Sequence, residues 1–249
     1  MLPLCLNHSY LLRQRKFKRN YMKDTVVLIP AYHPDQKLID TLQKLSEMEF
    51  TLLVVDDGSG SAYDPIFIEA ARYARVVRYA KNRGKGGALK QGMRCVLKCF
   101  PGMKYLITAD ADGQHRPDDI QKVSHRLHQK GGFVIGSRAF VGEVPLRSRF
   151  GNTVTRGVYR MVSGVSVKDT QTGLRGFDRS LLSWLIKIPG MRYEYEMNVL
   201  MSAARDNITI DEVMIETVYE NDNSSSHFRP LQDSVKIYKE IFRFALFDR

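Results

Sequence analysis

The chain has 249 residues, 43% of them hydrophobic and 26% charged, which is enough apolar material for a sizeable folded core and excludes a largely disordered protein. Its net charge of +11 favours anionic partners such as phosphorylated substrates, lipid headgroups or nucleic acid, without choosing among them. The three cysteines form no metal-binding pattern, and no apolar run approaches the roughly 18 residues of a membrane-spanning helix, so we expect neither a cysteine metal site nor such a helix in this sequence.

Strand-like and helix-like segments alternate through the first half. We expect strands over Thr25–Ile29, Phe50–Val55, Ala74–Tyr79, Tyr105–Thr108 and Phe133–Gly136. We expect helices over Asp35–Met48, Lys85–Phe100 and Asp118–Lys130. This alternation predicts an α/β fold with right-handed crossovers and a mostly parallel sheet flanked by helices. Such sheets bind ligands outside the carboxyl ends of their strands, where this chain carries its polar motifs.

The second half is less regular. Helices are expected over Arg149–Val162, Ser180–Ile186 and Glu194–Arg205, a short extended segment over Gly173–Phe177, and paired strands over Ile208–Val213 and Ile215–Tyr219. No Gly/Pro/Ser-rich linker interrupts the chain, so we predict one domain over residues 23–220. A basic extension over residues 1–22 precedes it, either as a solvated tail or as a segment that adheres to a membrane surface. Residues 221–249 follow as a polar loop and an amphipathic helix, Leu231–Phe247.

Asp110 and Asp112 follow the fourth strand in an Asp-x-Asp arrangement. Two carboxylates at a strand end can turn toward one hard cation, and Mg²⁺ or Mn²⁺ prefers such oxygen ligands together with substrate phosphates. Gln114 offers a third, neutral oxygen. The alternative is that the two acids are turn residues that cap the next helix.

Two further polar segments follow the second and third strands. Asp57 lies in an Asp-Asp-Gly-Ser turn, where its carboxylate can accept hydrogen bonds from ribose hydroxyls or a base edge, or merely shape the turn. Asn82–Ala88 (NRGKGGA) places glycines and cations at a helix N-terminus, which suits a pyrophosphate, although a flexible solvated loop is the alternative.

With Pro30-Ala31-Tyr32 after the first strand, these segments resemble family 2 glycosyltransferases, which carry a Pro-Ala-Tyr turn, Asp-Asp-Gly-Ser and Asp-x-Asp in this order. Within that family the chain is most similar to the polyprenyl-phosphate glycosyltransferases, the group that includes dolichyl-phosphate mannose synthase. The segments that carry this closer similarity are Asn82–Ala88, Asp110–His115, Gly136–Arg138 and Gln171–Phe177. The resemblance covers roughly Asp24–Tyr219 and implies a GT-A-type, Rossmann-like fold.

The resemblance also implies roles for individual residues. The nucleotide sugar would be bound by Pro30, Ala31, Tyr32, Asp57, Lys85 and Asp110. The metal, Mg²⁺ or Mn²⁺, would be held by Asp110, Asp112 and Gln114. The acceptor phosphate would be met by Arg138, Ser148 and Arg149. His227 and Arg229 lie where relatives place a segment that contacts phosphate, and the alternative for them is an exposed loop. Asp169 would face the site with Arg175 beside it, and Asp112, Asp169 and Arg138 would carry the catalysis. The alternative for Arg149 is a surface charge at a helix start.

Charge suggests the mechanism. The metal neutralises the leaving nucleoside diphosphate while the acceptor attacks the anomeric carbon in line, with inversion. A phosphate acceptor, with a second pKa of about 6, needs positioning more than deprotonation. A sugar hydroxyl would need a general base, for which Asp169 is the candidate. Both acceptors stay open.

The implied acceptor is lipid-linked, so we expect the protein at the cytoplasmic face of a membrane. The C-terminal helix would lie in the interface, lead into a membrane domain beyond this sequence, leave anchoring to a partner, or dock on the protein's own core. The competing functions are transfer to a saccharide hydroxyl, nucleotide-sugar synthesis and nucleic-acid binding. Nucleotide-sugar synthesis needs a glycine-rich loop where Pro30-Ala31-Tyr32 stands, and nucleic-acid binding leaves the acidic strand ends unexplained, so we expect no nucleic-acid partner. The sugar, the nucleotide and the lipid stay open.

Overall fold

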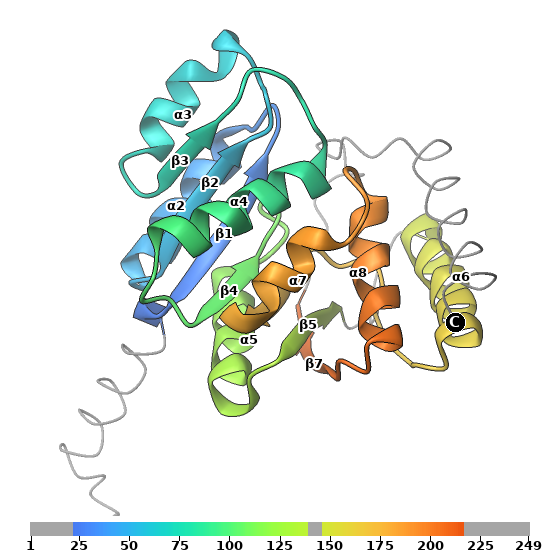
Figure 1. Cartoon of the computed structure of the whole chain (residues 1–249). Coiled ribbons are helices and arrows are strands. Elements are labelled where there is room, and N and C mark those ends of the chain that lie inside the picture. The colour runs from blue at the N-terminus through green and yellow to red at the C-terminus, as the bar shows by residue number, and fades with distance from the viewer. Residues whose placement is uncertain (1–21, 139–145, 217–249) are drawn as a thin grey trace, which may run out of the picture.

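The structure is a computed structural model that describes residues 22–138 and 146–216, with side chains in the second range from residue 155 onward. Its strands form one sheet in the order β3-β2-β1-β4-β6-β5-β7 (Figure 1). The strands are β1 (Thr25–Ala31), β2 (Thr51–Asp56), β3 (Arg75–Arg78), β4 (Tyr105–Thr108), β5 (Phe133–Arg138), β6 (Arg175–Asp178) and β7 (Ile210–Ile215). The strands β1 to β4 pair in parallel, β6 runs antiparallel between β4 and β5, and β7 is parallel to β5. The predicted mostly parallel sheet is confirmed.

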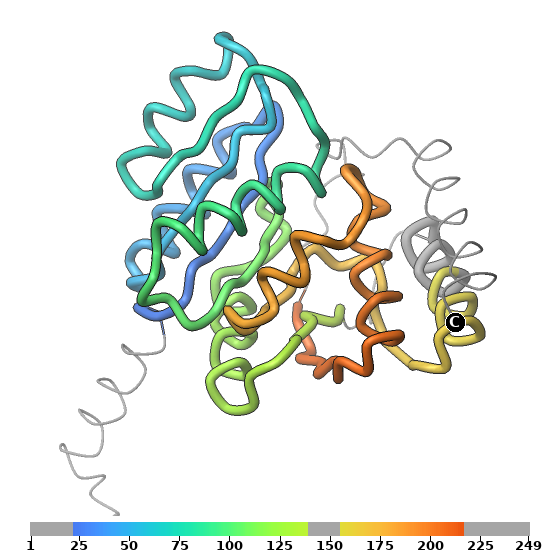
Figure 2. The backbone as a smooth tube through the Cα atoms, in the orientation of Figure 1, coloured from blue at the N-terminus to red at the C-terminus, as the bar shows by residue number. Residues whose placement is uncertain are grey.

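Helices cover both faces of this sheet (Figures 1 and 2). They are α2 (Gln36–Glu47), α3 (Asp64–Ala70), α4 (Lys85–Cys99), α5 (Pro117–Lys130), α6 (Leu146–Ser163), α7 (Leu182–Lys187) and α8 (Glu194–Arg205), with short 3₁₀ turns at Ser61–Tyr63 and Arg179–Leu181. Successive side chains of a strand point to opposite faces, so Val26 and Leu28 of β1 enter one core while Val27 and Ile29 enter the other. The first core lies under α4, α6, α7 and α8, and the second under α2, α3 and α5.

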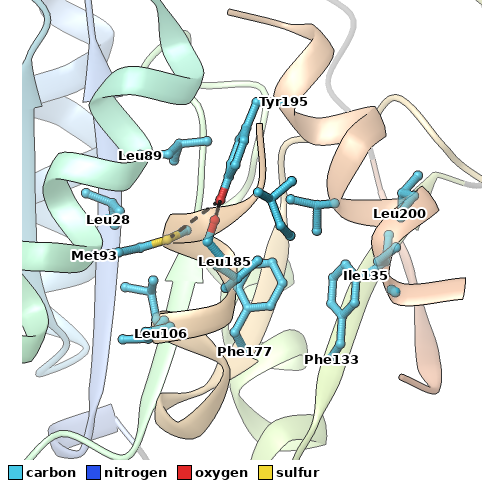
Figure 3. Packing of buried hydrophobic residues seen from close by; sticks show 14 of the residues in the cluster. Leu28, Leu89, Met93, Leu106, Phe133, Ile135, Phe177, Leu185, Tyr195 and Leu200 are labelled. Carbon is cyan, nitrogen blue, oxygen red and sulfur yellow. Dashed lines mark hydrogen bonds between the residues drawn. The ribbon is translucent and has the colours of Figure 1, made fainter. Parts of the chain in front are cut away.

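The first core also fixes α8 against α4, as Figure 3 shows. Tyr195 of α8 is almost fully buried, and its hydroxyl donates to the backbone oxygen of Leu185 at 3.0 Å and lies 3.9 Å from the sulfur of Met93. At the start of α4, a Cβ added to Gly86 would lie only 2.6 Å from the Cβ of Tyr195, so the two helices approach closely there. This packing sets the direction of Glu196, the next residue of α8.

Three sequence predictions need correction or fall outside this description. The expected break between a strand over Ile208–Val213 and one over Ile215–Tyr219 is wrong, because β7 runs unbroken from Ile210 to Ile215; residues 217–219 of the expected second strand lie outside the described residues. The strand β7 pairs with β5 over all six residues Phe133–Arg138, and no glycine, proline or asparagine interrupts it. The short helix α3 was missed because seven residues carry too little periodicity to stand out. The predicted C-terminal helix, Leu231–Phe247, lies outside the described residues.

Candidate active site

The polar motifs come together at one edge of the sheet. Because β1, β2, β4 and β5 are parallel to one another, directly or through β6, their carboxyl ends share that edge, and the residues after Ala31, Asp56, Thr108 and Arg138 meet there. The antiparallel β6 starts at the same edge, with Arg175 opposite Thr108 of β4. The loop before β6 is therefore delivered to the motifs as well.

Asp110 is the most constrained carboxylate of this edge. Its Oδ1 lies 2.7 Å from the Nζ of Lys85, and its Oδ2 lies 3.3 Å from the Nε2 of His115. Gly173 sits so close behind it that a Cβ there would meet the carboxylate. Burial works to raise the pKa of Asp110, but Lys85 and His115 outweigh it and hold that pKa well below its usual range. Asp110 is therefore a fixed anion at neutral pH.

Asp112 turns its carboxylate back on its own loop, where Oδ1 accepts a hydrogen bond from the backbone N–H of Gln114 at 3.0 Å. The N-cap position of α5 is Arg116, with no side-chain capping bond, so neither Asp110 nor Asp112 caps that helix. This disfavours the capping alternative raised by the sequence. Burial and then the nearby charge of Asp110 raise the pKa of Asp112.

The donor set fits a hard divalent cation. Asp110 and Asp112 offer carboxylate oxygens and Gln114 an amide oxygen, which are the ligands that Mg²⁺ and Mn²⁺ prefer. Within the described part of the chain, no group of three or more His, Cys, Asp or Glu side chains is arranged to hold a metal. An ion such as Mg²⁺ commonly takes one or two carboxylates and completes its shell with water and substrate phosphates. The repulsion that raises the pKa of Asp112 is also what a cation there would relieve.

Asp57 fastens two loops of the site to each other. Its Oδ1 accepts from the Tyr79 hydroxyl at 2.5 Å and from the Arg83 N–H at 2.8 Å, and its Oδ2 accepts from the Gly84 N–H at 2.8 Å. Gly58, next in the turn, has a φ of +77°, and a Cβ there would strike the backbone of the facing loop at 2.6 Å. The predicted nucleotide contact of Asp57 stays a prediction, because both of its oxygens already hold protein donors.

The glycine-rich segment 82–88 is ordered: its first three residues form a short loop, and its last four are the first turn of α4. Besides the two N–H groups bound by Asp57, those of Gly87 and Ala88 donate to the carbonyls of Met191 and Gly84. The loop therefore offers a diphosphate fewer backbone N–H groups than its sequence suggests. The segment contributes Lys85 to the site, because the Lys85 ammonium lies against Asp110.

The end of β1 forms the other wall of the predicted nucleotide site. Tyr32, after Pro30 and Ala31, stacks on His33 with ring centroids 3.8 Å apart, and His33 stacks on Tyr63 at 4.6 Å. The carbonyl of Ala31 accepts from the backbone N–H of Asp57 at 2.8 Å, which joins this wall to the Asp57 turn. The sequence-predicted nucleotide residues are thus brought together, while their contact with a nucleotide stays a prediction.

Arg138 and Asp169 form a two-pronged ion pair. The Nε of Arg138 lies 2.5 Å from Oδ2 of Asp169, and its terminal nitrogen lies 3.0 Å from Oδ1. The Asp169 side chain has no exposed surface, and its Oδ1 also accepts from the N–H of Gln171 at 3.0 Å. A general base must reach the proton that it removes. A fully enclosed carboxylate that grips an arginine is placed instead to orient that arginine.

Arg175 is a buried cation at the centre of the acidic groups. Its guanidinium donates to the carbonyls of Thr172 at 3.0 Å, Glu196 at 2.7 Å and Thr170 at 3.4 Å. Burial lowers the pKa of Arg175, while the nearby carboxylates, Glu196 first and Asp169 next, raise it. The predicted partnership of Arg175 with Asp169 thus takes the form of an electrostatic contact and of a hold on the loop that carries Asp169.

Glu196 is a carboxylate candidate of the sequence that we assigned to a packing helix, and the structure places it in the site. Its Oε2 lies 3.0 Å from the Nζ of Lys85, so it faces the site, whereas Glu194 accepts hydrogen bonds from the N–H groups of Met191 and Arg192 just before α8. Two tyrosines flank Glu196 and favoured a packing helix, and no local pattern marks which side of α8 meets Lys85.

Part of the predicted acceptor site cannot be placed. Ser148 and Arg149 belong to α6, but their side chains lie outside the described part of the chain. His227 and Arg229 also lie outside it. Their roles stay predictions.

The comparison with known families decides the assignment that this geometry suggests. The model of the family described as "Glycosyl transferase family 2" matches residues 26–184, which include β1, the Asp57 turn, the Asp110–Asp112 pair and the Arg138–Asp169 pair. The chain belongs to glycosyl transferase family 2. It is therefore a glycosyltransferase, and the suspected family is confirmed.

Curated relatives of this family 2 chain cover most of its length. An uncharacterised protein of Methanocaldococcus jannaschii is 34% identical over 205 residues, which span 79% of this chain and 83% of that protein. The UDP-N-acetylglucosamine–dolichyl-phosphate N-acetylglucosaminyltransferase of Methanococcus voltae is 29% identical over 78% of this chain and 85% of its own. The dolichyl-phosphate beta-glucosyltransferase of Saccharomyces cerevisiae is 28% identical over 86% of this chain and 72% of its own.

Solved structures confirm the fold of this family 2 chain. A crystal structure of glucosyl-3-phosphoglycerate synthase from Mycobacterium tuberculosis, in complex with Mn²⁺, uridine diphosphate and glucosyl-3-phosphoglycerate, matches with a TM-score of 0.66. The match covers all of this chain and 85% of that one at 18% identity, so it speaks for the fold alone. The predicted GT-A-type architecture is thereby confirmed.

Proposed function

We propose that this family 2 glycosyltransferase transfers a sugar from a UDP- or GDP-linked donor to a polyprenyl phosphate, with inversion and with the help of Mg²⁺ or Mn²⁺. Two of the relatives described above are named for transfer to dolichyl phosphate, one with N-acetylglucosamine and one with glucose. They share most of their length with this chain, so the acceptor class is the natural first hypothesis.

The state of Asp169 is the observation that carries this proposal. A hydroxyl acceptor needs a base to take its proton, whereas a phosphate monoester with a second pKa of about 6 is largely dianionic at neutral pH and needs none. Asp169, the base candidate of the sequence, is fully buried and holds Arg138 with both oxygens. An arginine held in this way suits two-pronged recognition of a phosphate. The site therefore favours a phosphate acceptor over a hydroxyl acceptor.

The other residues divide the remaining work between the donor and the metal. Asp110, Asp112 and Gln114 would hold the divalent cation, which when bound neutralises charge on the leaving diphosphate. A solved structure of the same fold contains Mn²⁺ together with uridine diphosphate, which supports a divalent metal here. Asp57 keeps the loop before α4 against the site, and Lys85 follows that loop as the first residue of α4.

The location follows from the acceptor and stays a proposal. Polyprenyl phosphates reside in membranes, and the net charge of +11 favours an anionic surface, so we place the enzyme at the cytoplasmic face of a membrane. No helix in the described ranges is long and apolar enough to cross a membrane. Sedimentation of the full chain with vesicles, anionic against neutral, tests this part. Equal, negligible binding to both would argue against it.

A panel assay tests the activity. Purified full-length protein is incubated with Mn²⁺ or Mg²⁺, a set of UDP- and GDP-sugars, and a short polyprenyl phosphate. We expect one donor to give an organic-extractable glycolipid that disappears with EDTA and with Asp112→Asn. The matched control is Asp118→Asn, which removes the same charge from an exposed residue of the nearby α5. Product formation in the presence of EDTA would refute the proposed metal requirement. Release of nucleotide only when a saccharide is present would refute the proposed polyprenyl-phosphate acceptor.

A further inference from the structure

Lys85 lies between two acidic groups that come from different parts of the fold. It is the first residue of α4, and its side chain is only 16% exposed. The ammonium lies 2.7 Å from Oδ1 of Asp110, after β4, and 3.0 Å from Oε2 of Glu196, on α8. It also lies 5.9 Å from the ring centroid of Tyr193. The Lys85 ammonium therefore forms ion pairs with both of these carboxylates.

These surroundings keep Lys85 charged. A lysine is ordinarily protonated at neutral pH, and the carboxylates of Asp110 and Glu196, at 2.7 and 3.0 Å, stabilise its ammonium. It occupies an oxygen of Asp110, the same carboxylate that is proposed to hold the divalent metal. A metal ion that binds Asp110 must therefore share the carboxylate with the Lys85 ammonium or displace that ammonium.

The backbone around Lys85 is fixed, so a change of partner by its ammonium must come from rotation about side-chain bonds alone. Asp57 binds the N–H groups of Arg83 and Gly84, and the carbonyl of Met191 accepts from Gly87, so the start of α4 is anchored on both sides of Lys85. The lysine stem carries its ammonium on four flexible carbons, and a compact ammonium forms phosphate contacts as readily as carboxylate contacts. A helix N-terminus is also a favourable place for an anion.

We propose that Lys85 is an internal counter-ion: it neutralises Asp110 in the empty enzyme and moves to the donor diphosphate when the nucleotide binds. This inference rests on the proposed function, because it takes the donor to be a nucleoside diphosphate. The consequence is that nucleotide and divalent cation bind cooperatively, since each favours the state in which Lys85 has left Asp110. Such coupling is reciprocal, so metal must tighten the nucleotide as much as nucleotide tightens the metal.

The experiment measures binding of Mn²⁺ to the full chain by electron paramagnetic resonance, without nucleotide and with saturating UDP or GDP. The variants are Lys85→Ala and Lys85→Gln, the second of which keeps most of the side-chain length without the charge. The matched control is Lys104→Ala. Lys104 also pairs with an aspartate, Asp24, at 2.8 Å, but at the opposite edge of the sheet, where β1 and β4 begin.

We expect a nucleotide to tighten Mn²⁺ binding to the wild type by about 10-fold or more, within the usual range of coupling between sites. In both Lys85 variants, Mn²⁺ alone should bind about 10-fold tighter than to the wild type, and the coupling should shrink to the part that direct contact between the metal and the diphosphate supplies. Lys104→Ala should match the wild type. Unchanged or weaker Mn²⁺ binding by the Lys85 variants without nucleotide, or a wild type without coupling, overturns the proposal.

Thermal unfolding gives a second readout that also reports folding. Without Lys85 the two carboxylates lose their cation, so Mn²⁺ alone should raise the melting temperature more in Lys85→Gln than in the wild type. An equal rise in both proteins contradicts the inference. Failure of the counter-ion proposal can be told apart from failure of the proposed function. If the enzyme makes glycolipid but the Lys85 variants keep the wild-type coupling, only the counter-ion proposal is refuted. If the coupling depends on Lys85 but no glycolipid forms, only the proposed acceptor is refuted.

Discussion

Gly173 lies directly against the carboxylate of Asp110, and replacing this glycine tests whether the position of that carboxylate matters. In Gly173→Ala the new Cβ would lie 2.8 Å from Cγ of Asp110. Non-bonded carbon atoms are comfortable at about 3.5–4.0 Å, so one of the two groups must retreat by roughly 0.7 to 1.2 Å. The Gly173 carbonyl accepts from the Thr108 hydroxyl at 2.8 Å, and Arg175 grips the carbonyls of the same loop. The loop is held, so Asp110 must move.

A displacement of about 1 Å in a catalytic constellation can lower the rate by about 10²-fold. We therefore expect kcat/KM of Gly173→Ala for the donor to fall by about 10²-fold. Overpacking costs about 1–3 kcal/mol, and for a chain of this length that lowers the melting temperature by only about 2–12 °C. Activity should thus fall far more than the folded fraction at the assay temperature.

The assay is glycolipid formation under metal saturation, paired with thermal unfolding of the same preparation. Gly157→Ala is the control, because Gly157 lies exposed on α6 with nothing within 4 Å of an added Cβ, and alanine there should stabilise the helix by about 0.5–1 kcal/mol. If Gly173→Ala keeps its kcat/KM within about threefold of the wild type, the placement of Asp110 is not what the site depends on.

Three further substitutions test other parts of the account. Asp57→Asn should destabilise the fold by about 1–3 kcal/mol and raise the KM for the sugar donor, because an amide cannot accept hydrogen bonds from all the groups that donate to Asp57. Urea unfolding measures the stability and initial rates measure the KM. An unchanged KM would contradict the role given to the loop before α4. Arg175→Met should lower the free energy of unfolding by about 3–5 kcal/mol, since two short bonds from a charged donor are lost, and a loss below about 1 kcal/mol in urea would show that the buried guanidinium is dispensable. Burial lowers the pKa of His128 below the ordinary value of about 6.5. Between these two pKa values the unfolded chain binds more protons than the folded chain. The free energy of unfolding therefore falls as the pH drops through this window, by at most about 1.4 kcal/mol per pH unit. His128→Asn should flatten that part of the urea-derived profile, and an unaltered slope from pH 7 to pH 5 would refute the assignment.

The sequence was a good guide to the first half of the site because the information there is local. An apolar run that ends in acids marks a strand and its carboxyl end, and parallel pairing brings such ends together. Asp57, Asp110 and Asp112 are found in this way, and all three lie at the predicted edge of the sheet. The donors to Asp57 could not be predicted from a local pattern, because Tyr79 and Gly84 come from the segment between β3 and α4.

The second half required information that no local pattern holds. The antiparallel β6 enters the sheet between β4 and β5, which is what brings Arg175 and the loop with Asp169 and Gly173 to the edge. Glu196 reaches Lys85 only because Tyr195 anchors α8 in the core. The ion pair between Asp169 and Arg138 likewise joins a loop to a strand that is distant in sequence. These contacts depend on tertiary packing, so a sequence pattern names the residues without their partners.

The measurement that most directly tests the central claim compares two acceptors that differ only in the phosphate. The enzyme, its donor and Mn²⁺ are incubated with a polyprenyl phosphate or with the corresponding free polyprenol, and the products are analysed by mass spectrometry and ³¹P NMR. We predict product only from the phosphate, with the anomeric carbon bonded through oxygen to phosphorus, because we propose that Arg138 binds the acceptor phosphate and because the Asp169 carboxylate is not exposed as a base. Glycosylated polyprenol, formed at a comparable rate, would contradict the account.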